Sequence, residues 1–145
     1  MDSRASYFLR QLPVVALASV ALAGCSASGE PSGDRTFSDS DVPFTFRIPV
    51  DFTTESVDQF DSRGDVVAAA GIDKVDVVAV RRVAAGVTLP RGDVAHVVQG
   101  KAVTSRLHEV SAGGGRWAIE CQWTADRRKK VLHACDEAFA TVKRR

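Results

Sequence analysis

The chain contains no asparagine and therefore has no acceptor site for N-glycosylation. It also lacks a large excess of either charge, because its 19 Lys and Arg residues and 18 Asp and Glu residues give a formal net charge of +1. A nucleic-acid-binding protein normally carries a strong basic excess, so this balance argues against a nucleic acid partner. The composition is rich in Ala, Val, Arg and Asp and has more Arg than Lys, which indicates a GC-rich genome.

Sequence motifs of common enzyme classes are also missing. There is no Gly-x-Ser-x-Gly elbow that would present a nucleophilic serine. Gly100-Lys101 stands between Ala95 and Ala102, so the other anchor residues of a phosphate-binding loop are absent. The histidines have no metal-ligand spacing, although three separate elements could bring them together. They are His96, His108 and His133. We expect no catalytic residue, no metal site and no cofactor, and we do not expect an enzyme.

Two pairs of aspartates lie in predicted loops, Asp58 with Asp61 and Asp73 with Asp76. Paired carboxylates can do acid–base work or bind calcium, but neither pair has the spacing of an EF-hand loop. We interpret them as solvated loop charges, because Asp is seldom buried.

The first 24 residues have the parts of a secretory signal, with Arg4 and Arg10 ahead of an apolar segment at Leu12–Ala21. This apolar segment is too short for a membrane-spanning helix, which needs about 20 residues. Leu22-Ala23-Gly24-Cys25 follows it and resembles the lipobox of bacterial lipoproteins. In that family the cysteine thiol is diacylglycerylated and the bond before it is cut. The resemblance implies that residues 1–24 are removed and that Cys25 is lipidated; the alternative is an uncleaved N-terminal anchor helix.

Residues 25–41 are expected to be the lipidated Cys25, which the lipobox resemblance implies, followed by a flexible tether, because residues 26–41 are small and polar. A single domain is expected over residues 42–145, because this length can bury its own core. The anchor would hold that domain at the cell membrane, on its extracytoplasmic face.

Within the domain, period-2 alternation and turn residues predict an antiparallel sheet. Val77, Val78 and Val80 fall on both faces of their strand, which indicates a central strand covered on each side. Two helices are predicted, one beginning at Asp93 with Val94, Val97 and Val98 on one face, and a terminal one from about Asp126. The predicted strands cover residues 44–48, 53–57, 66–70, 75–83, 104–110 and 116–123.

Cys121 and Cys135 are predicted to form a disulfide bond. In the predicted strand, Cys121 shares its face with Trp117, Ile119 and Trp123, and Cys135 lies on the apolar face of the terminal helix. With Cys25 taken by the lipid, these two remain as an even pair in a compartment that permits disulfides. Two buried free thiols are the alternative.

Several segments resemble the Mog1/PsbP-like fold of small actinobacterial lipoproteins. They are Phe44-Thr-Phe-Arg-Ile-Pro49 followed by Phe52, Gly71 to Val80, and the Cys121…Cys135-Asp136…Phe139 strand–helix unit. The resemblance covers roughly residues 42–143. It implies an α+β fold in which helices flank an antiparallel sheet, an α/β/α sandwich. It implies no catalytic residue, because members act mainly as accessory or binding proteins with differing partners.

We therefore expect a lipid-anchored, non-catalytic binding or accessory module, whose protein partner would be in the cell envelope. The alternative is a carrier that holds a small apolar ligand between sheet and helices, in a pocket lined by Phe44, Phe46, Trp117 and Trp123. These aromatic residues would otherwise fill the core. The basic run Arg127–Lys130 is expected either to contact anionic lipid headgroups or to be a solvated first helical turn.

Overall fold

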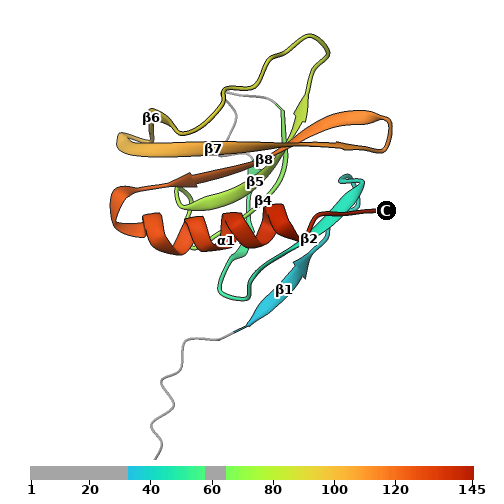
Figure 1. Cartoon of the computed structure of the whole chain (residues 1–145). Coiled ribbons are helices and arrows are strands. Elements are labelled where there is room, and N and C mark those ends of the chain that lie inside the picture. The colour runs from blue at the N-terminus through green and yellow to red at the C-terminus, as the bar shows by residue number, and fades with distance from the viewer. Residues whose placement is uncertain (1–32, 58–64) are drawn as a thin grey trace, which may run out of the picture.

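Two antiparallel sheets and one α-helix make up the part of the protein that the computed structural model describes, residues 33–57 and 65–145 (Figure 1). The larger sheet has six strands in the order β3-β4-β5-β8-β7-β6, and the smaller has the order β1-β2-β9. The strands are β1 (Asp34–Phe37), β2 (Phe44–Pro49), β3 (Thr53–Glu55), β4 (Val66–Gly71), β5 (Val77–Val83), β6 (Val94–Val98), β7 (Lys101–Ala112), β8 (Gly115–Trp123) and β9 (Lys143–Arg144). A 3-10 turn, η2 (Ala125–Arg127), leads into the helix α1 (Arg128–Ala140).

The helix α1 lies over β8 and β5 on one face of the larger sheet and also contacts β2 of the smaller sheet (Figure 1). Its buried side chains recur every three or four residues, as expected for a helix with one apolar face. They are Val131, Ala134, Cys135 and Ala138. The core is therefore closed from three sides, by the helix, by the smaller sheet and by the large sheet.

The two central strands of the larger sheet are buried on both faces. In β5, residues 77–81 are buried, which confirms that this strand is covered on each side. In β8, residues 117–123 are buried without interruption, so Glu120 and Gln122 lie inside the protein. Apolar and polar side chains do alternate between the two faces of β8, but both of these faces are buried.

The predicted antiparallel pairing of neighbouring strands is confirmed in two hairpins. β4 and β5 pair antiparallel around the loop that contains Asp73 and Lys74. β7 and β8 are joined by Gly113 and Gly114, whose φ angles are 58° and 74°. Positive φ at both central residues is the signature of the type I′ turn, which glycine adopts without steric cost.

The helix predicted from Asp93 is wrong, because Val94–Val98 forms the edge strand β6, paired with β7. Gln99 and Gly100 connect the two strands with φ angles of 50° and 74°, a second two-residue turn with positive φ. The valines lie at helical spacing by coincidence, and the turn at Gly100 determines the local structure.

The folded domain begins before Val42, the start expected from the sequence. Asp34–Phe37 forms β1 against β2, and the Phe37 ring stacks on Phe46 with centroids 4.7 Å apart. This strand was not predicted because Phe37 is its one buried apolar residue and the residues around it are polar. The described residues form an α+β arrangement of antiparallel strands with a single α-helix, which covers one face of the larger sheet. Cys25, Asp58 and Asp61 lie outside the described residues.

Gly71 at the end of β4 is expected to tolerate no side chain. A Cβ there would lie 2.6 Å from the Asp73 carbonyl oxygen and 2.7 Å from the Asp76 carbonyl oxygen. Gly71→Ala should therefore lower the free energy of unfolding in urea by about 1–3 kcal/mol, the usual cost of overpacking. Gly115→Ala is the matched control, because a Cβ there meets its nearest neighbour, Trp117 Nε1, at an ordinary 3.5 Å. Equal stability of the two variants would contradict this account of the β4–β5 hairpin.

Candidate functional site

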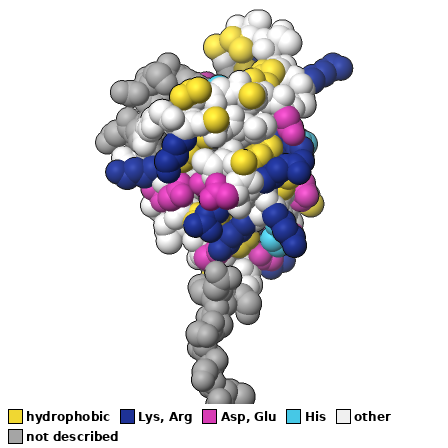
Figure 2. Space-filling view, turned by 90° about the vertical axis from the view of Figure 1, so that its left-hand side faces the viewer, with side chains coloured by type: hydrophobic (Ala, Val, Ile, Leu, Met, Phe, Trp, Pro, Cys, Tyr) yellow, Lys and Arg dark blue, Asp and Glu magenta, His cyan; other side chains and the backbone are white. Residues whose placement is uncertain are grey.

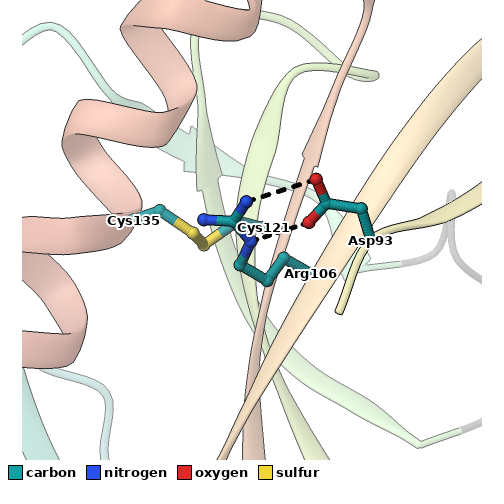
Figure 3. The surroundings of a disulfide bond; sticks show 4 residues. All are labelled: Asp93, Arg106, Cys121 and Cys135. Atoms are coloured by element: carbon teal, nitrogen blue, oxygen red, sulfur yellow. Dashed lines mark hydrogen bonds and ion pairs between the residues drawn. A yellow bond between two sulfur atoms is a disulfide. The ribbon is translucent and has the colours of Figure 1, made fainter. Parts of the chain in front are cut away.

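Cys121 in β8 and Cys135 in α1 form a disulfide bond, which confirms the predicted pairing (Figure 3). Their Cα atoms are 5.9 Å apart, and both residues are fully buried. The bond links the helix to the middle of the large sheet. Closing a loop of 14 residues contributes about 3 kcal/mol in the chain-entropy model.

Arg106 lies beside the disulfide and fixes the segment that leads into β6 (Figure 3). It is the β7 residue opposite Cys121 in the strand register. Its Nε and Nη2 atoms donate to the two carboxylate oxygens of Asp93 at 2.7 and 3.2 Å, and its guanidinium lies 5.7 Å from the Trp123 ring centroid. The hydrogen bond from Arg106 lowers the pKa of Asp93, so this pair is ionised at neutral pH.

A row of polar side chains is buried on the sheet face opposite the helix. Arg81 in β5 donates hydrogen bonds to Glu120 in β8 and to Asp65. Arg81 and Glu120 are only 6% and 2% exposed. Removing one member of a buried ion pair leaves an uncompensated charge, so the two residues depend on each other. In the same row, Ser105 Oγ and His96 Nε2 are 2.6 Å apart.

This polar row was missed because a strand with alternating polarity normally exposes its polar side. The signal that would have found it is in β5, where Val77 and Ala79 share a face with Arg81. A covered apolar face on β5 requires the neighbouring face of β8 to be covered as well. Glu120 then has to lie inside the protein, with Arg81 as a nearby cation.

Asp73 and Asp76 hold the end of β5 against the end of β8. Asp76 is 2% exposed and accepts hydrogen bonds from the Thr124 backbone N–H at 2.7 Å and from the Thr124 hydroxyl at 2.9 Å. Asp73 Oδ1 accepts from the backbone N–H groups of Val75 and Asp76 at 2.7 and 2.8 Å. The interpretation of Asp76 as a solvated loop charge is therefore wrong, because its carboxyl is a buried structural acceptor.

The environment shifts the two carboxyl groups of this pair in opposite directions. Burial raises the pKa of Asp76, and the neighbouring Asp73 charge raises it further, while the hydrogen bonds from Thr124 oppose the shift. Burial alone would raise the pKa of Asp73 too, but the backbone hydrogen bonds from Asp76 and Val75 outweigh it and lower that pKa. A side-chain hydrogen bond joins the two groups, so the proton of the pair is held mainly by Asp76.

A surface groove of about 540 Å³ lies beside the loop between β5 and β6. Arg116 holds this loop in place, donating from Nη1 to the Val87 carbonyl at 2.9 Å and from Nε to Glu109 at 2.6 Å. Val87 is 46% exposed, and Leu89 and Leu107 add apolar surface to the groove. The groove is therefore a surface of fixed shape that combines apolar side chains with charged groups.

The aromatic residues considered as a ligand pocket are buried in the core. Phe44 packs edge-on against Trp117 with centroids 6.1 Å apart and lies 6.3 Å from Phe46. Trp123 is 2% exposed and belongs to the same cluster. These contacts support the interpretation in which the aromatic rings fill the core.

The three histidines have different neighbours. His96 contacts Ser105, and the His108 ring stacks on Phe139 with centroids 4.6 Å apart, while His133 is exposed on α1. Within residues 33–57 and 65–145, no group of three His, Cys, Asp or Glu side chains is arranged to hold a metal ion.

Comparison of the chain with models of protein families and with curated proteins found no match. Among the described residues, no helix has both the length and the apolar character needed to cross a bilayer.

The Asp73–Asp76 pair predicts a specific dependence of stability on pH. A carboxyl whose folded-state pKa is raised above 3.8 contributes stability that is present below pH 3.8 and is lost as pH rises through the raised value. Asp73 is already ionised in that window, because its pKa is lowered. Asp76→Asn keeps a neutral acceptor for Thr124, so its stability relative to wild type should increase as the pH rises from about 4 through the raised pKa of Asp76, and then stay constant.

Urea unfolding at several pH values measures this difference, with Asp76→Ala as the control. The alanine variant leaves the N–H and hydroxyl of Thr124 without their buried acceptor and should lose about 1–3 kcal/mol at every pH. Parallel curves for wild type and Asp76→Asn would contradict the assignment of the proton to Asp76.

Proposed function

We propose that the protein is a lipid-anchored lipoprotein of the cell envelope, held by Cys25 at the extracytoplasmic face of the cytoplasmic membrane. There it acts as a non-catalytic binding or accessory module. The membrane is its first partner, through the N-terminal lipid, and an envelope protein is the second.

The observation that carries this proposal is the pairing of the cysteines. Cys121 and Cys135 are joined in the buried disulfide, so Cys25 is the one cysteine of the sequence outside that bond. It stands directly after Leu22-Ala23-Gly24, at the end of a segment with the charge and apolar pattern of a secretory signal. A disulfide in a small domain fits an oxidising, exported setting, which the signal independently implies.

A non-catalytic role is supported by the contact that most resembles a catalytic pair. Ser105 lies 2.6 Å from His96, the distance expected of a nucleophile and its base. Ser105 is only 2% exposed in the middle of the large sheet, so a substrate carbonyl cannot reach its hydroxyl. The pair is better explained as a hydrogen bond within the buried polar row.

A binding role is supported by the surface groove beside the loop between β5 and β6, where Val87 is exposed and Arg116 fixes the loop. The aromatic residues do not support the carrier alternative, because they pack against one another in the core. We further propose that the domain is Mog1/PsbP-like, because an antiparallel sheet followed by a C-terminal helix is compatible with that family. The single described helix departs from the helices on both sheet faces that the family resemblance implies.

Cys25→Ala tests the anchor in cells that export the protein. Wild type should incorporate labelled palmitate, fractionate with membranes and begin at residue 25. The variant should incorporate no palmitate and keep its N-terminal segment, because the acceptor thiol is gone. Palmitate incorporation by the variant equal to wild type would refute the lipobox assignment.

Crosslinking in the same cells tests the binding role. A crosslinked product between the anchored wild type and a single envelope protein, weakened by Val87→Asp in the groove, would support it. The control is His133→Asp, a change at an exposed position on α1. If neither protein neighbours nor an effect of Val87→Asp is found, the binding role fails, and native mass spectrometry for a bound small molecule would test the carrier.

A further inference from the structure

The point at which the described chain begins is linked to the start of α1 through the residues that follow β2. The Gly33 carbonyl accepts a hydrogen bond from the Val50 backbone N–H at 3.1 Å. The next residue, Asp51, pairs with Lys130 in the first turn of α1 at 2.5 Å. Gly33 and the basic segment that opens the helix are therefore linked by two short contacts.

The basic segment is exposed and largely without counter-charges. Arg127, Arg128 and Lys129 are all exposed. None of the three makes an ion pair within 4.0 Å with another residue of the described ranges. Their charges are therefore directed to solvent.

A further cation joins this surface from the sheet. Lys101, the first residue of β7, acts on the same carboxyl as Arg127: a hydrogen bond from Thr124 is the main cause of the lowered pKa of Asp126, and the charges of Arg127 and Lys101 lower it further. Lys101 acts on Asp126 and Asp73, which are both ionised, and Arg128 acts on Asp93, which is paired with Arg106. With Arg106 included, five cations stand against three carboxylates, which leaves a basic excess. Figure 2 views this end of the molecule and shows Lys and Arg side chains gathered over it, with Asp and Glu among them.

We propose that this surface, the basic end formed by Lys101, Arg127, Arg128 and Lys129, docks on the anionic phospholipid headgroups of the membrane that anchors the protein. The inference rests on the proposed lipidation of Cys25. It adds a defined orientation, in which the start of α1 faces the bilayer and the groove at Val87 stays accessible to a partner.

The length of the connecting chain supports a lipid surface as the occupant. Seven residues separate Cys25 from Gly33, and a fully extended chain of this length reaches at most about 29 Å. A domain of this size is about 34 Å across. The tether is thus shorter than the domain, so the end that contains Gly33 is kept close to the headgroups. Each basic residue near an anionic surface favours docking by about fivefold.

Energy transfer from tryptophan to a headgroup-labelled lipid measures the orientation. The two tryptophans are Trp117 and Trp123, and Trp123 ends β8 four residues before Arg127, so energy transfer from it rises when the basic end approaches the bilayer. The full protein purified from membranes is reconstituted in vesicles of phosphatidylcholine alone or mixed with phosphatidylglycerol, each with a trace of dansyl-labelled lipid. We expect greater transfer in the anionic vesicles, and we expect that excess to disappear in 1 M salt, where screening limits electrostatic range to about 3 Å.

Two double variants with the same change in net charge locate the effect. Arg128→Glu with Lys129→Glu should lower the ratio of docked to undocked protein by at least about 25-fold in anionic vesicles. These changes should not prevent folding, because acidic side chains in the first turn interact favourably with the helix dipole. Lys143→Glu with Arg144→Glu, in exposed β9 beyond the other end of α1, should leave docking unchanged.

The outcomes separate this inference from the proposed function. Retention on phosphatidylcholine vesicles reports the anchor alone, so loss of retention would count against the lipidation of Cys25. Equal transfer in the two kinds of vesicle, or equal effects of the two double variants, would overturn the docking of the basic end while leaving the anchor intact.

Discussion

The contact between β8 and α1 is the constraint on which the rest of the fold depends. β8 is the strand next to both β5 and β7, and α1 lies directly over it. The Cys121–Cys135 disulfide makes this contact covalent at its buried centre. The smaller sheet packs against the same helix through β2, so the core closes only when the helix is in place. A domain of this size gains much from such a link, because its core alone provides a small margin of stability.

Burial of the central strands on both faces explains why polar groups lie inside the domain. Each strand of an antiparallel sheet has two faces, and here neither face of β5 or β8 is open to solvent. Polar residues on the face away from α1 must then find partners, and Arg81 and Glu120 do so. The same requirement holds at the end of the sheet, where Asp76 serves Thr124 as an acceptor. These networks join neighbouring strands of the sheet.

The sequence predicted the strand pattern well where apolar periodicity and turn residues agreed. The β4–β5 and β7–β8 hairpins, the terminal helix and the disulfide pairing all followed from such local signals. The prediction of a helix from Asp93 failed because Val94, Val97 and Val98 have helical spacing, whereas the turn at Gln99 and Gly100 pairs this segment with β7 as the strand β6. β1 was missed because Phe37 is its single buried apolar side chain. The burial of Glu120 and Asp76 could not be derived from periodicity, since it depends on which sheet face is covered and on contacts between distant strands.

The proposal joins two features, a lipid at Cys25 and a domain closed by one disulfide in an oxidising compartment. Intact-mass measurement of the protein extracted from membranes without reductant tests both in the same molecule. The account predicts a chain that begins at Cys25, carries the mass of a diacylglyceryl group, and gains the mass of two hydrogens on reduction. A chain that begins at any other residue, or whose mass does not change on reduction, would contradict it.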